Sequence, residues 1–336
     1  MIVHATSARS VAARWLEAGA PPWARGWSDA LARIHAPFAA RAVARPLAIP
    51  RGATIVTVGG ATLGGSGKTR LAHAVVRALA RRGADVILVG HASRAHPSRA
   101  RIVSVDDAIR DVGDEALMCA RALRASARVV VAPRRQQAID LAASLARVIV
   151  IDGPLQLAPV AASLALLAVD AHAPWGSGAL PPAGDLRAAR EALLAHADVV
   201  VRVDATPRAV ILDHATVALG ELAAATAGRR LGLFTAIARP QRLENALRAA
   251  GVDVPIVVHA PDHGPVRPSS VTRAFRADPS LAGLLRTAPV DLWLATGKCA
   301  LHLAPLVGDR SIALLDGTCE LSAEAEAALD GLRGCL

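Results

Sequence analysis

A glycine-rich stretch, residues 59–67, carries residue types that can hold phosphate groups. The β-branched run Ile55–Val58 leads into it, and Lys68 and Thr69 follow at the start of an apolar-periodic segment. Glycines let successive backbone N–H groups point at phosphate oxygens, and a helix beginning at Lys68 adds its positive N-terminal end. Lys68 would reach the β- and γ-phosphates of ATP, and the Thr69 hydroxyl would hold Mg²⁺. The spacing therefore predicts a nucleoside triphosphate site.

The residues expected to bind the nucleotide are Thr62, Gly64, Gly65, Ser66, Gly67, Lys68 and Thr69. The strict pattern G-x-x-x-x-G-K-[ST] has glycine where this sequence has Thr62. A glycine-rich turn with a chance lysine is the alternative interpretation. The strand and helix predicted on either side favour the phosphate loop.

Carboxylates follow two apolar strands further along the chain. Asp152 ends the run 148–152, as expected of the carboxylate that supports Mg²⁺ beside a phosphate loop. Asp170 follows the run 164–169 in the same way. One of these two aspartates can therefore be a turn residue without a role in binding Mg²⁺. Asp114 and Glu115 open an apolar helix, where acidic residues are common because of the helix dipole alone.

The alternation of apolar strands with helical segments predicts an α/β fold. We expect a mainly parallel sheet flanked by helices, of the P-loop NTPase type, with a second, smaller α/β lobe. The predicted division is an N-terminal helical segment 1–50, a nucleotide-binding domain 51–215 and a C-terminal lobe 216–336. The stretch 205–230 is interpreted as connecting structure.

A net charge of +10 predicts an anionic partner. Arginine supplies most of the positive charge, since Lys68 and Lys298 are the only lysines. Nucleic acid is not expected, because the chain has no such binding motif and no aromatic residues interleaved with the basic ones. The four cysteines show no C-x-x-C spacing, which indicates a reducing cytoplasm rather than a disulfide framework or a zinc site.

Residues 1–50 combine arginines with three tryptophans, Trp15, Trp23 and Trp27. Such a segment suits a membrane interface, and packing of the tryptophans onto the domain is an equal alternative. Prolines at 21, 22 and 37 argue against one long helix. Neither a signal peptide nor a transmembrane span is predicted.

The order of these motifs resembles the tetraacyldisaccharide 4′-kinase family, the lipid A 4′-kinases of Gram-negative bacteria. The segments that carry the resemblance are Val58–Thr69, Gly113–Glu115, Pro181–Ala188, Ala236–Pro240, Asp262–His263 and Thr296–Cys299. Their combination is specific to the family, whereas the glycine-rich loop alone is shared by many kinases.

The resemblance implies transfer of the γ-phosphate of ATP to the 4′-hydroxyl of an acylated glucosamine disaccharide 1-phosphate, in lipid A biosynthesis. Lys68 would act on the phosphates, and Asp114 would accept the hydroxyl proton with help from His263. The implied Mg²⁺ ligands are Thr69, Glu115 and Asp152. The implied acceptor-binding residues are Gln156, Arg187, Asp262 and Lys298. The same resemblance, with the basic charge, implies peripheral attachment to the anionic cytoplasmic face of the inner membrane.

The sequence also departs from the family pattern. The family's S-R-G-Y is here Gly90-His-Ala-Ser, a second Asp is replaced by Gly153, a His by Leu157, and the Asp of T-x-K-D by Cys299. One alternative is therefore a catalytically weakened relative that binds nucleotide or lipid. The other is a switch ATPase of the partitioning type, although Leu63 stands where such proteins usually have a signature lysine.

Overall fold

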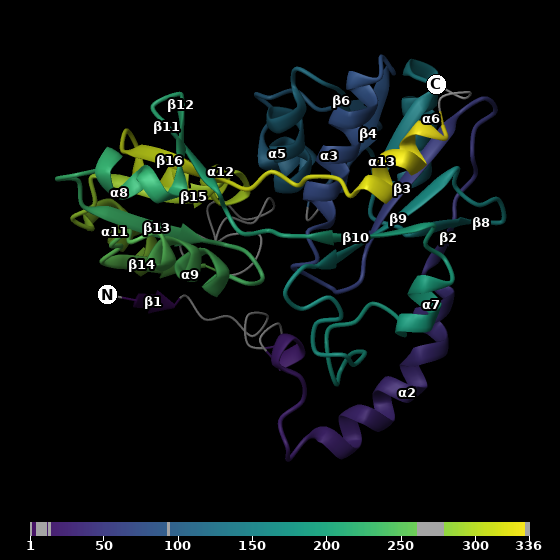
Figure 1. Ribbon diagram of the computed structural model, residues 1–336, viewed down its shortest axis with the longest axis horizontal. Coiled ribbons are helices and arrows are strands. Elements are labelled where there is room, and N and C mark those ends of the chain that lie inside the picture. The colour runs from purple at the N-terminus through teal and green to yellow at the C-terminus, as the bar shows by residue number, and fades with distance from the viewer. Residues whose placement is uncertain (1, 5–11, 13–14, 93–94, 261–278, 333–336) are drawn as a thin grey trace. The chain divides into compact units, whose positions relative to one another are not determined.

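The protein is described by a computed structural model that covers residues 2–4, 12, 15–92, 95–260 and 279–332 (Figure 1). The chain forms two compact units. The first holds residues 12–205 and the stretch from Cys319 onward, and the second holds residues 206–318 with the N-terminal strand. No helix among the described residues is long and apolar enough to cross a membrane.

The first unit is built on a mainly parallel sheet of strand order β10-β9-β3-β7-β4-β6-β5, in which only the β5–β6 pairing is antiparallel. Its strands are β3 Thr54–Gly60, β4 Val86–Val89, β5 Arg101–Ile102, β6 Arg128–Val131, β7 Val148–Asp152, β9 Leu164–Asp170 and β10 Val199–Val203. A separate parallel pair joins β2 Ala44–Pro46 to β8 Gln156–Ala158. The helices are α2 Arg25–Arg41, α3 Lys68–Arg81, α4 Ile109–Val112, α5 Asp114–Leu123, α6 Arg135–Leu145, α7 Arg190–Leu194 and α13 Ala323–Asp330.

Every residue of β3, β7 and β9 is buried, which requires cover on both faces of the sheet. On one face, Ile55, Ile87 and Ile149 pack with Ile139 of α6 in a single apolar cluster. Helix α3 lies against β3, β4 and β7 (Figure 1). The predicted fold class is thereby confirmed for this unit, and its short β-branched strands explain it.

The second unit has its own sheet, in the order β1-β14-β13-β15-β16-β11-β12. Its strands are β1 Ile2–His4, β11 Ala209–Leu212, β12 Ala215–Ala218, β13 Leu231–Thr235, β14 Ile256–His259, β15 Leu292–Thr296 and β16 Ser311–Asp316. The helical segments are η1 Leu219–Glu221, α8 Leu222–Ala225, α9 Gln241–Ala249, α11 Pro279–Thr287 and α12 Gly297–Val307. This unit is the smaller α/β lobe expected from the sequence.

The observed division differs from the predicted bounds in three places. Residues 209–218 are not connecting structure but the hairpin β11–β12, which pairs with β16 and extends the second sheet. Helix α13 belongs to the first unit, where Arg82 at the end of α3 binds Glu326 and Asp330. Helix α2 also packs there, through Ala39 and the adjacent Val43.

We expected Pro37 to interrupt a helix. Helix α2 instead contains Pro37 within its 17 residues. Its apolar residues divide between two faces. Ala32 and Ala39 are buried, whereas Trp27, Leu31, Ile34 and Phe38, together with Trp23 just before the helix, are exposed. Trp15 instead packs, since its indole N–H donates to the carbonyl of Pro182 at 3.1 Å. The rings of Trp23 and Trp27 contact that of Trp15, with centroid distances of 5.4 and 6.0 Å.

Candidate active site

The phosphate loop joins β3 directly to α3. Strand β3 ends at Gly60, and α3 begins at Lys68. Gly67, immediately before α3, has a φ of 78°, in the left-handed region that favours glycine. A side chain at this position would also collide with Val203 of β10. The backbone can thus turn from sheet to helix only with glycine at this position.

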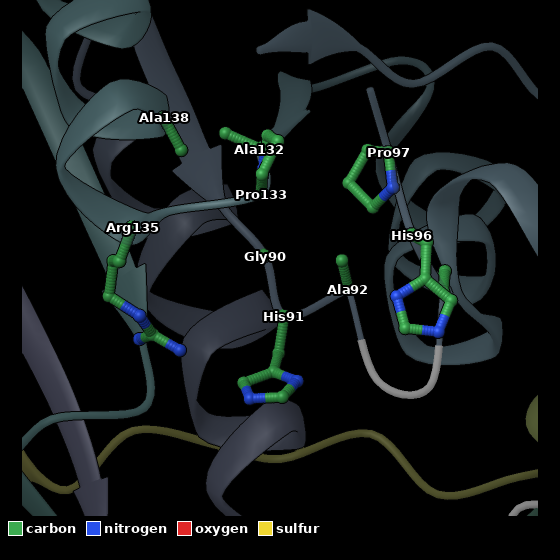
Figure 2. A pocket seen from close by; sticks show the side chains of 10 residues that line it. Gly90, His91, Ala92, His96, Pro97, Ala132, Pro133, Arg135 and Ala138 are labelled. Carbon is green, nitrogen blue, oxygen red and sulfur yellow. The ribbon is translucent and has the colours of Figure 1, made fainter. Parts of the chain in front are cut away.

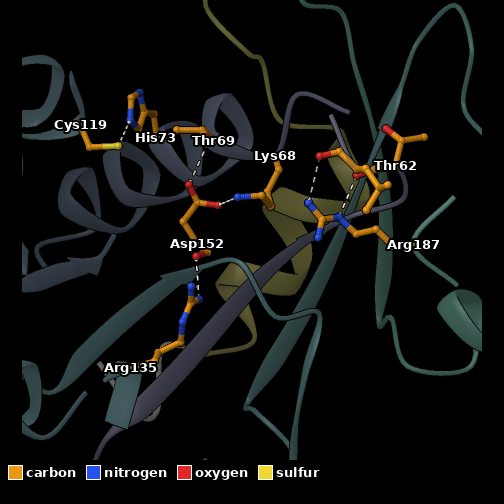
Figure 3. Close-up of polar contacts among 9 residues, drawn as sticks. Thr62, Lys68, Thr69, His73, Cys119, Arg135, Asp152 and Arg187 are labelled. Carbon is orange, nitrogen blue, oxygen red and sulfur yellow. Dashed lines mark hydrogen bonds and ion pairs between the residues drawn. The ribbon is translucent and has the colours of Figure 1, made fainter. Parts of the chain in front are cut away.

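Lys68, Thr69 and Asp152 form one polar cluster at the end of the loop (Figure 3). The ammonium of Lys68 forms an ion pair with Oδ1 of Asp152, and the Thr69 hydroxyl donates to Oδ2 at 2.9 Å. Asp152 is in register with Val58, because β3 and β7 are parallel neighbours. Parallel strands bring their carboxyl ends to the same edge of a sheet, and this places Asp152 beside the loop.

The carboxyl group of Asp152 is almost fully buried. Burial alone raises its pKa, but the charge of Lys68 and the hydrogen bonds from Lys68 and Thr69 outweigh this and hold the pKa below its ordinary value. Asp152 is therefore ionised at neutral pH. Asp170, by contrast, accepts hydrogen bonds from the backbone N–H groups of His172 and Ala173. Of the two strand-end aspartates, Asp170 closes a turn and Asp152 faces the phosphate loop.

Arg135 brings a second cation to Asp152. It is the first residue of α6, after β6, and its guanidinium donates to the backbone carbonyl of Asp152 at 2.8 Å (Figure 3). A side chain at Gly153 would collide with this guanidinium. The chain thus places a positive charge next to the position where the family pattern has a second aspartate. Burial lowers the pKa of Arg135, and the negative charge of Asp152 opposes that effect.

Asp114 and Glu115 begin α5, as expected. Asp114 is only 2% exposed, and its Oδ1 accepts the backbone N–H of Glu115 at 2.9 Å. Glu115 is less buried. Burial lowers the pKa of Arg187, and the negative charges of Asp152 and Glu115 oppose that effect.

Arg187 supports the first half of the phosphate loop. Its Nε donates to the carbonyl of Thr62 at 2.8 Å and its Nη2 to that of Leu63 at 3.4 Å (Figure 3). The loop before it is held by Asp185, a buried carboxylate that accepts from the backbone N–H and hydroxyl of Ser177. The backbone carbonyl of Asp185 also accepts from the N–H of Leu63. The resemblance predicted that Arg187 binds the acceptor. In the structure its guanidinium donates hydrogen bonds to backbone carbonyls of the phosphate loop.

Gln156 and Lys298 are the other predicted acceptor residues that the structure describes. The amide oxygen of Gln156 accepts from the backbone N–H groups of Leu157 and Ala162 and so closes the turn after β8. Lys298 lies in the first turn of α12, in the second unit. Asp262 and His263 lie outside the described residues.

Two further family-like segments meet inside the second unit. The thiol of Cys299 accepts the backbone N–H of Ala236 at 3.2 Å, and its own N–H donates to the Thr296 hydroxyl at 3.4 Å. Cys299 is fully buried, and burial raises the pKa of its thiol. It therefore stays neutral at the position where the family pattern has a charged aspartate.

A cavity of about 360 Å³ opens at the carboxyl ends of β4 and β6 (Figure 2). Its polar lining consists of His91, His96 and Arg135. Burial and the charge of Arg135 lower the pKa of His91, while Glu115 and Asp152 raise it by a smaller amount. His91 therefore lies within electrostatic range of the same carboxylates as the phosphate loop.

A buried contact lies behind the loop, between α3 and α5. Nε2 of His73 is 3.1 Å from the sulfur of Cys119 (Figure 3). Burial lowers the pKa of His73 to about 4, against a partial opposing effect of Asp152. Burial also raises the pKa of the Cys119 thiol well above its ordinary value. Both groups are therefore neutral near pH 7.

This pKa predicts a loss of stability in mild acid. Between pH 6.5 and about 4 the unfolded chain binds a proton at His73 and the folded chain does not, so stability falls as the pH decreases. Between pH 7.5 and pH 5 this residue should lower the free energy of unfolding by up to about 2 kcal/mol. Urea unfolding at both values should show a smaller pH dependence for His73→Gln than for the natural protein. An equal dependence in both would contradict the assignment.

The donor set at the loop suits Mg²⁺ rather than a transition metal. Thr69, Asp152 and Glu115 offer hydroxyl and carboxylate oxygens, the ligands that hard cations prefer. Within the described part of the chain, no three His, Cys, Asp or Glu side chains cluster as a metal cage. Mg²⁺ does not require one, because it commonly retains water and binds one or two carboxylates together with substrate phosphates.

Sequence reasoning did not assign roles to Arg135, Asp185, His73 or Cys119. The position of Arg135 could have been predicted from the sequence. It follows a strand of the same sheet as Asp152, and the carboxyl ends of parallel strands lie at the same edge of the sheet. The other three depend on contacts between segments or turns that no local pattern encodes.

A strand, a glycine loop with a left-handed turn, a lysine and hydroxyl at the helix start, and an acidic strand end together define a P-loop nucleotide-binding protein. The family model for tetraacyldisaccharide-1-phosphate 4′-kinase (LpxK) matches residues 30–292. The chain therefore belongs to the tetraacyldisaccharide 4′-kinase family. This membership favours a kinase over the switch ATPase that the sequence left open.

Individual relatives agree with the family match. The chain is 35% identical over 277 residues to a tetraacyldisaccharide 4′-kinase of Methylorubrum extorquens, an alignment covering 75% of this chain and 82% of the relative. It is 31% identical over 287 residues to that of Gluconacetobacter diazotrophicus, covering 80% and 86%. A crystal structure of LpxK from Aquifex aeolicus in complex with ATP shares the fold, with a TM-score of 0.66, 18% identity and coverage of 91% and 96%.

Proposed function

We propose that this chain transfers the γ-phosphate of ATP to the 4′-hydroxyl of an acylated glucosamine disaccharide 1-phosphate, a step of lipid A biosynthesis. The observation that carries the proposal is the cluster of Lys68, Thr69 and Asp152 at the phosphate loop of a chain that belongs to this kinase family. ATP and Mg²⁺ are the cofactors that this cluster fits.

Phosphoryl transfer requires the protein mainly to position the reactants and to offset negative charge. Lys68 exchanges its ion pair with Asp152 for the β- and γ-phosphates, and the loop amides bind the remaining phosphate oxygens. Mg²⁺, when bound, neutralises charge that develops on the phosphates. Arg135 adds a fixed positive charge at the same edge of the sheet.

Asp114 is the proposed base, with His263 as its helper. Its carboxylate is buried at the N-terminus of α5, and its Oδ1 is oriented by the backbone N–H of Glu115. An oriented carboxylate at the start of a helix can accept the proton of the attacking hydroxyl. Thr69, Glu115 and Asp152 remain the proposed Mg²⁺ ligands.

The direct test is transfer of labelled γ-phosphate from ATP to a lipid A disaccharide 1-phosphate. We expect labelled product that depends on Mg²⁺ and on both substrates. ATP binding without transfer would instead favour the weakened relative, for which Gly153 and the buried thiol of Cys299 are the specific observations.

The cavity beside the loop is proposed to hold the phosphate-bearing sugar of the acceptor. Its volume of about 360 Å³ is within the usual range for small-molecule sites, and Arg135 gives it positive charge. His91 and His96 supply ring N–H donors for phosphate oxygens. The basic stretch 94–101 is also proposed to meet the phosphate of the acceptor, since arginine forks onto phosphate oxygens.

Substituting His96 should therefore act on the acceptor and not on ATP. For His96→Ala we expect a KM for the disaccharide 1-phosphate that rises roughly tenfold, because one hydrogen bond to a charged group is lost. The KM for ATP should change less than twofold. Steady-state kinetics with each substrate varied in turn make this comparison, and equal effects on both would contradict the assignment.

The exposed stripe on α2 is proposed to attach the enzyme to the anionic cytoplasmic face of the inner membrane. Trp27, Leu31, Ile34 and Phe38 recur at intervals of three and four residues, so they share one face of α2, and Trp23 lies just before the helix. Trp23 is 75% exposed, Ile34 65% and Phe38 62%. An apolar face of this kind lies in the headgroup region of a bilayer, where arginines meet lipid phosphates.

Truncating side chains on this face should weaken membrane binding. We expect Trp27→Ala combined with Phe38→Ala to lower the partition onto anionic phospholipid vesicles by on the order of tenfold or more, from the apolar area lost. The matched control is Ile102→Ala with Val160→Ala, two exposed apolar residues outside α2. Vesicle sedimentation compares the variants, and equal binding of the α2 variant and the natural protein would refute the attachment.

A further inference from the structure

The contact between His73 and Cys119 lies one helical turn behind two proposed metal ligands. Thr69 and His73 are separated by four residues on α3, and Glu115 and Cys119 by four residues on α5. Side chains four residues apart lie on the same face of a helix. The contact of 3.1 Å between Nε2 and sulfur therefore joins the two helices one turn after Thr69 on α3 (Figure 3) and one turn after Glu115 on α5.

The chemistry of this pair is that of a neutral hydrogen bond. A reactive cysteine requires a thiolate, yet burial raises the pKa of Cys119 and lowers that of His73. A nucleophilic role is thereby excluded near pH 7. What remains is a directional contact between a buried thiol and a neutral imidazole.

The two proposed ligands are held by different parts of the fold. Thr69, on α3, is tied to the end of β7 by its hydrogen bond to Asp152. Glu115 follows Gly113, whose φ of 89° and ψ of 151° form a sharp joint between the short helix α4 and α5. Two printed polar contacts join α5 to α3. One is the hydrogen bond from Arg77 to the carbonyl of Ala122 at 3.1 Å, near the far end of α5, and the other is His73–Cys119, which lies closer to Glu115.

We propose that His73 and Cys119 are positioning residues that set the spacing of Glu115 from Thr69, and thereby the affinity for the divalent cation that accompanies the nucleotide. This inference rests on the proposed function, since it assumes the metal site of the kinase. Neither residue touches the cation or the phosphates. Both act through the helices that carry the ligands.

The test compares Cys119→Ala with Cys119→Ser in the full chain. Mn²⁺, a paramagnetic substitute for Mg²⁺, is titrated by electron paramagnetic resonance in the presence of a non-hydrolysable ATP analogue. Loss of a group that orients metal ligands commonly weakens metal binding by 10- to 100-fold. We expect about tenfold weaker Mn²⁺ binding for Cys119→Ala and a change of less than about threefold for Cys119→Ser, whose hydroxyl still bonds His73. Binding of the analogue in EDTA should be equal in all three proteins.

The outcomes separate a positioning role from a merely structural one. If Cys119→Ala lowers the melting temperature but binds Mn²⁺ normally, the inference is overturned. It is also overturned if Cys119→Ser is as impaired as Cys119→Ala. Absence of nucleotide-dependent Mn²⁺ binding in the natural protein would refute the proposed metal site itself, which is a different result.

Discussion

Replacing Lys68 with methionine should lower the rate of phosphoryl transfer by on the order of 10³-fold or more. Lys68 is the first residue of α3, and its ammonium already lies at the end of the loop, in an ion pair with Asp152. Methionine has a similar length but no charge, so it removes the cation without removing bulk. Single-turnover transfer of labelled γ-phosphate measures the effect on chemistry separately from product release.

The matched control is Arg81→Met, which removes an exposed cation from the other end of the same helix. It should retain the full rate. If the loss of one positive charge from the protein explained the effect of Lys68→Met, Arg81→Met would show the same loss of rate. Lys68→Arg should be strongly impaired as well, since a guanidinium cannot occupy the volume of an ammonium at a loop packed against Asp152. Transfer by Lys68→Met within tenfold of the natural rate would exclude this loop as the catalytic phosphate site.

Replacing Asp114 with asparagine should lower kcat by roughly 10²- to 10⁴-fold with little change in either KM. The amide oxygen of asparagine can still accept the backbone N–H of Glu115, so the start of α5 should keep its structure. What is lost is the ability to take up a proton. Steady-state kinetics, with thermal unfolding as a check on folding, distinguish these effects.

Asp111→Asn provides the comparison for that experiment. Asp111 lies on α4 just before the joint at Gly113, and its side chain is about half exposed. Its loss changes the charge near α5 without touching the proposed base. A fall in kcat for both variants by the same factor would indicate an electrostatic field effect and would contradict the role of Asp114 as base.

The nucleotide half of the site was predictable because each of its parts has a local signature. A β-branched run, closely spaced glycines and the pair Lys68–Thr69 together predict a strand, a phosphate loop and a helix. The carboxylate Asp152 could be expected beside them, because it ends an apolar strand of a parallel sheet. The sequence could not decide between Asp152 and Asp170, because β7 and β9 both neighbour β3. The contacts of Asp152 with Lys68 and Thr69 decide it.

The acceptor half was not predictable to the same degree, because its geometry depends on contacts between distant segments. The resemblance suggested that Arg187 binds the acceptor, but its guanidinium bonds carbonyls 125 and 124 residues away in the chain. Gln156 uses its amide oxygen to close its own turn. The hairpin β11–β12 was missed because its strands have four residues each, and strands this short are individually too weak a signal.

The return of α13 to the first unit has a consequence for how the chain folds as it is made. The ion pair between Arg82 and Glu326 joins residues 244 positions apart, and residues 206–318 of the second unit are synthesised between them. At a ribosomal rate of roughly 5–20 residues per second, this interval lasts about 12 to 50 s. Apart from strand β1, the second unit can therefore fold while the nucleotide-binding unit still awaits its final helix.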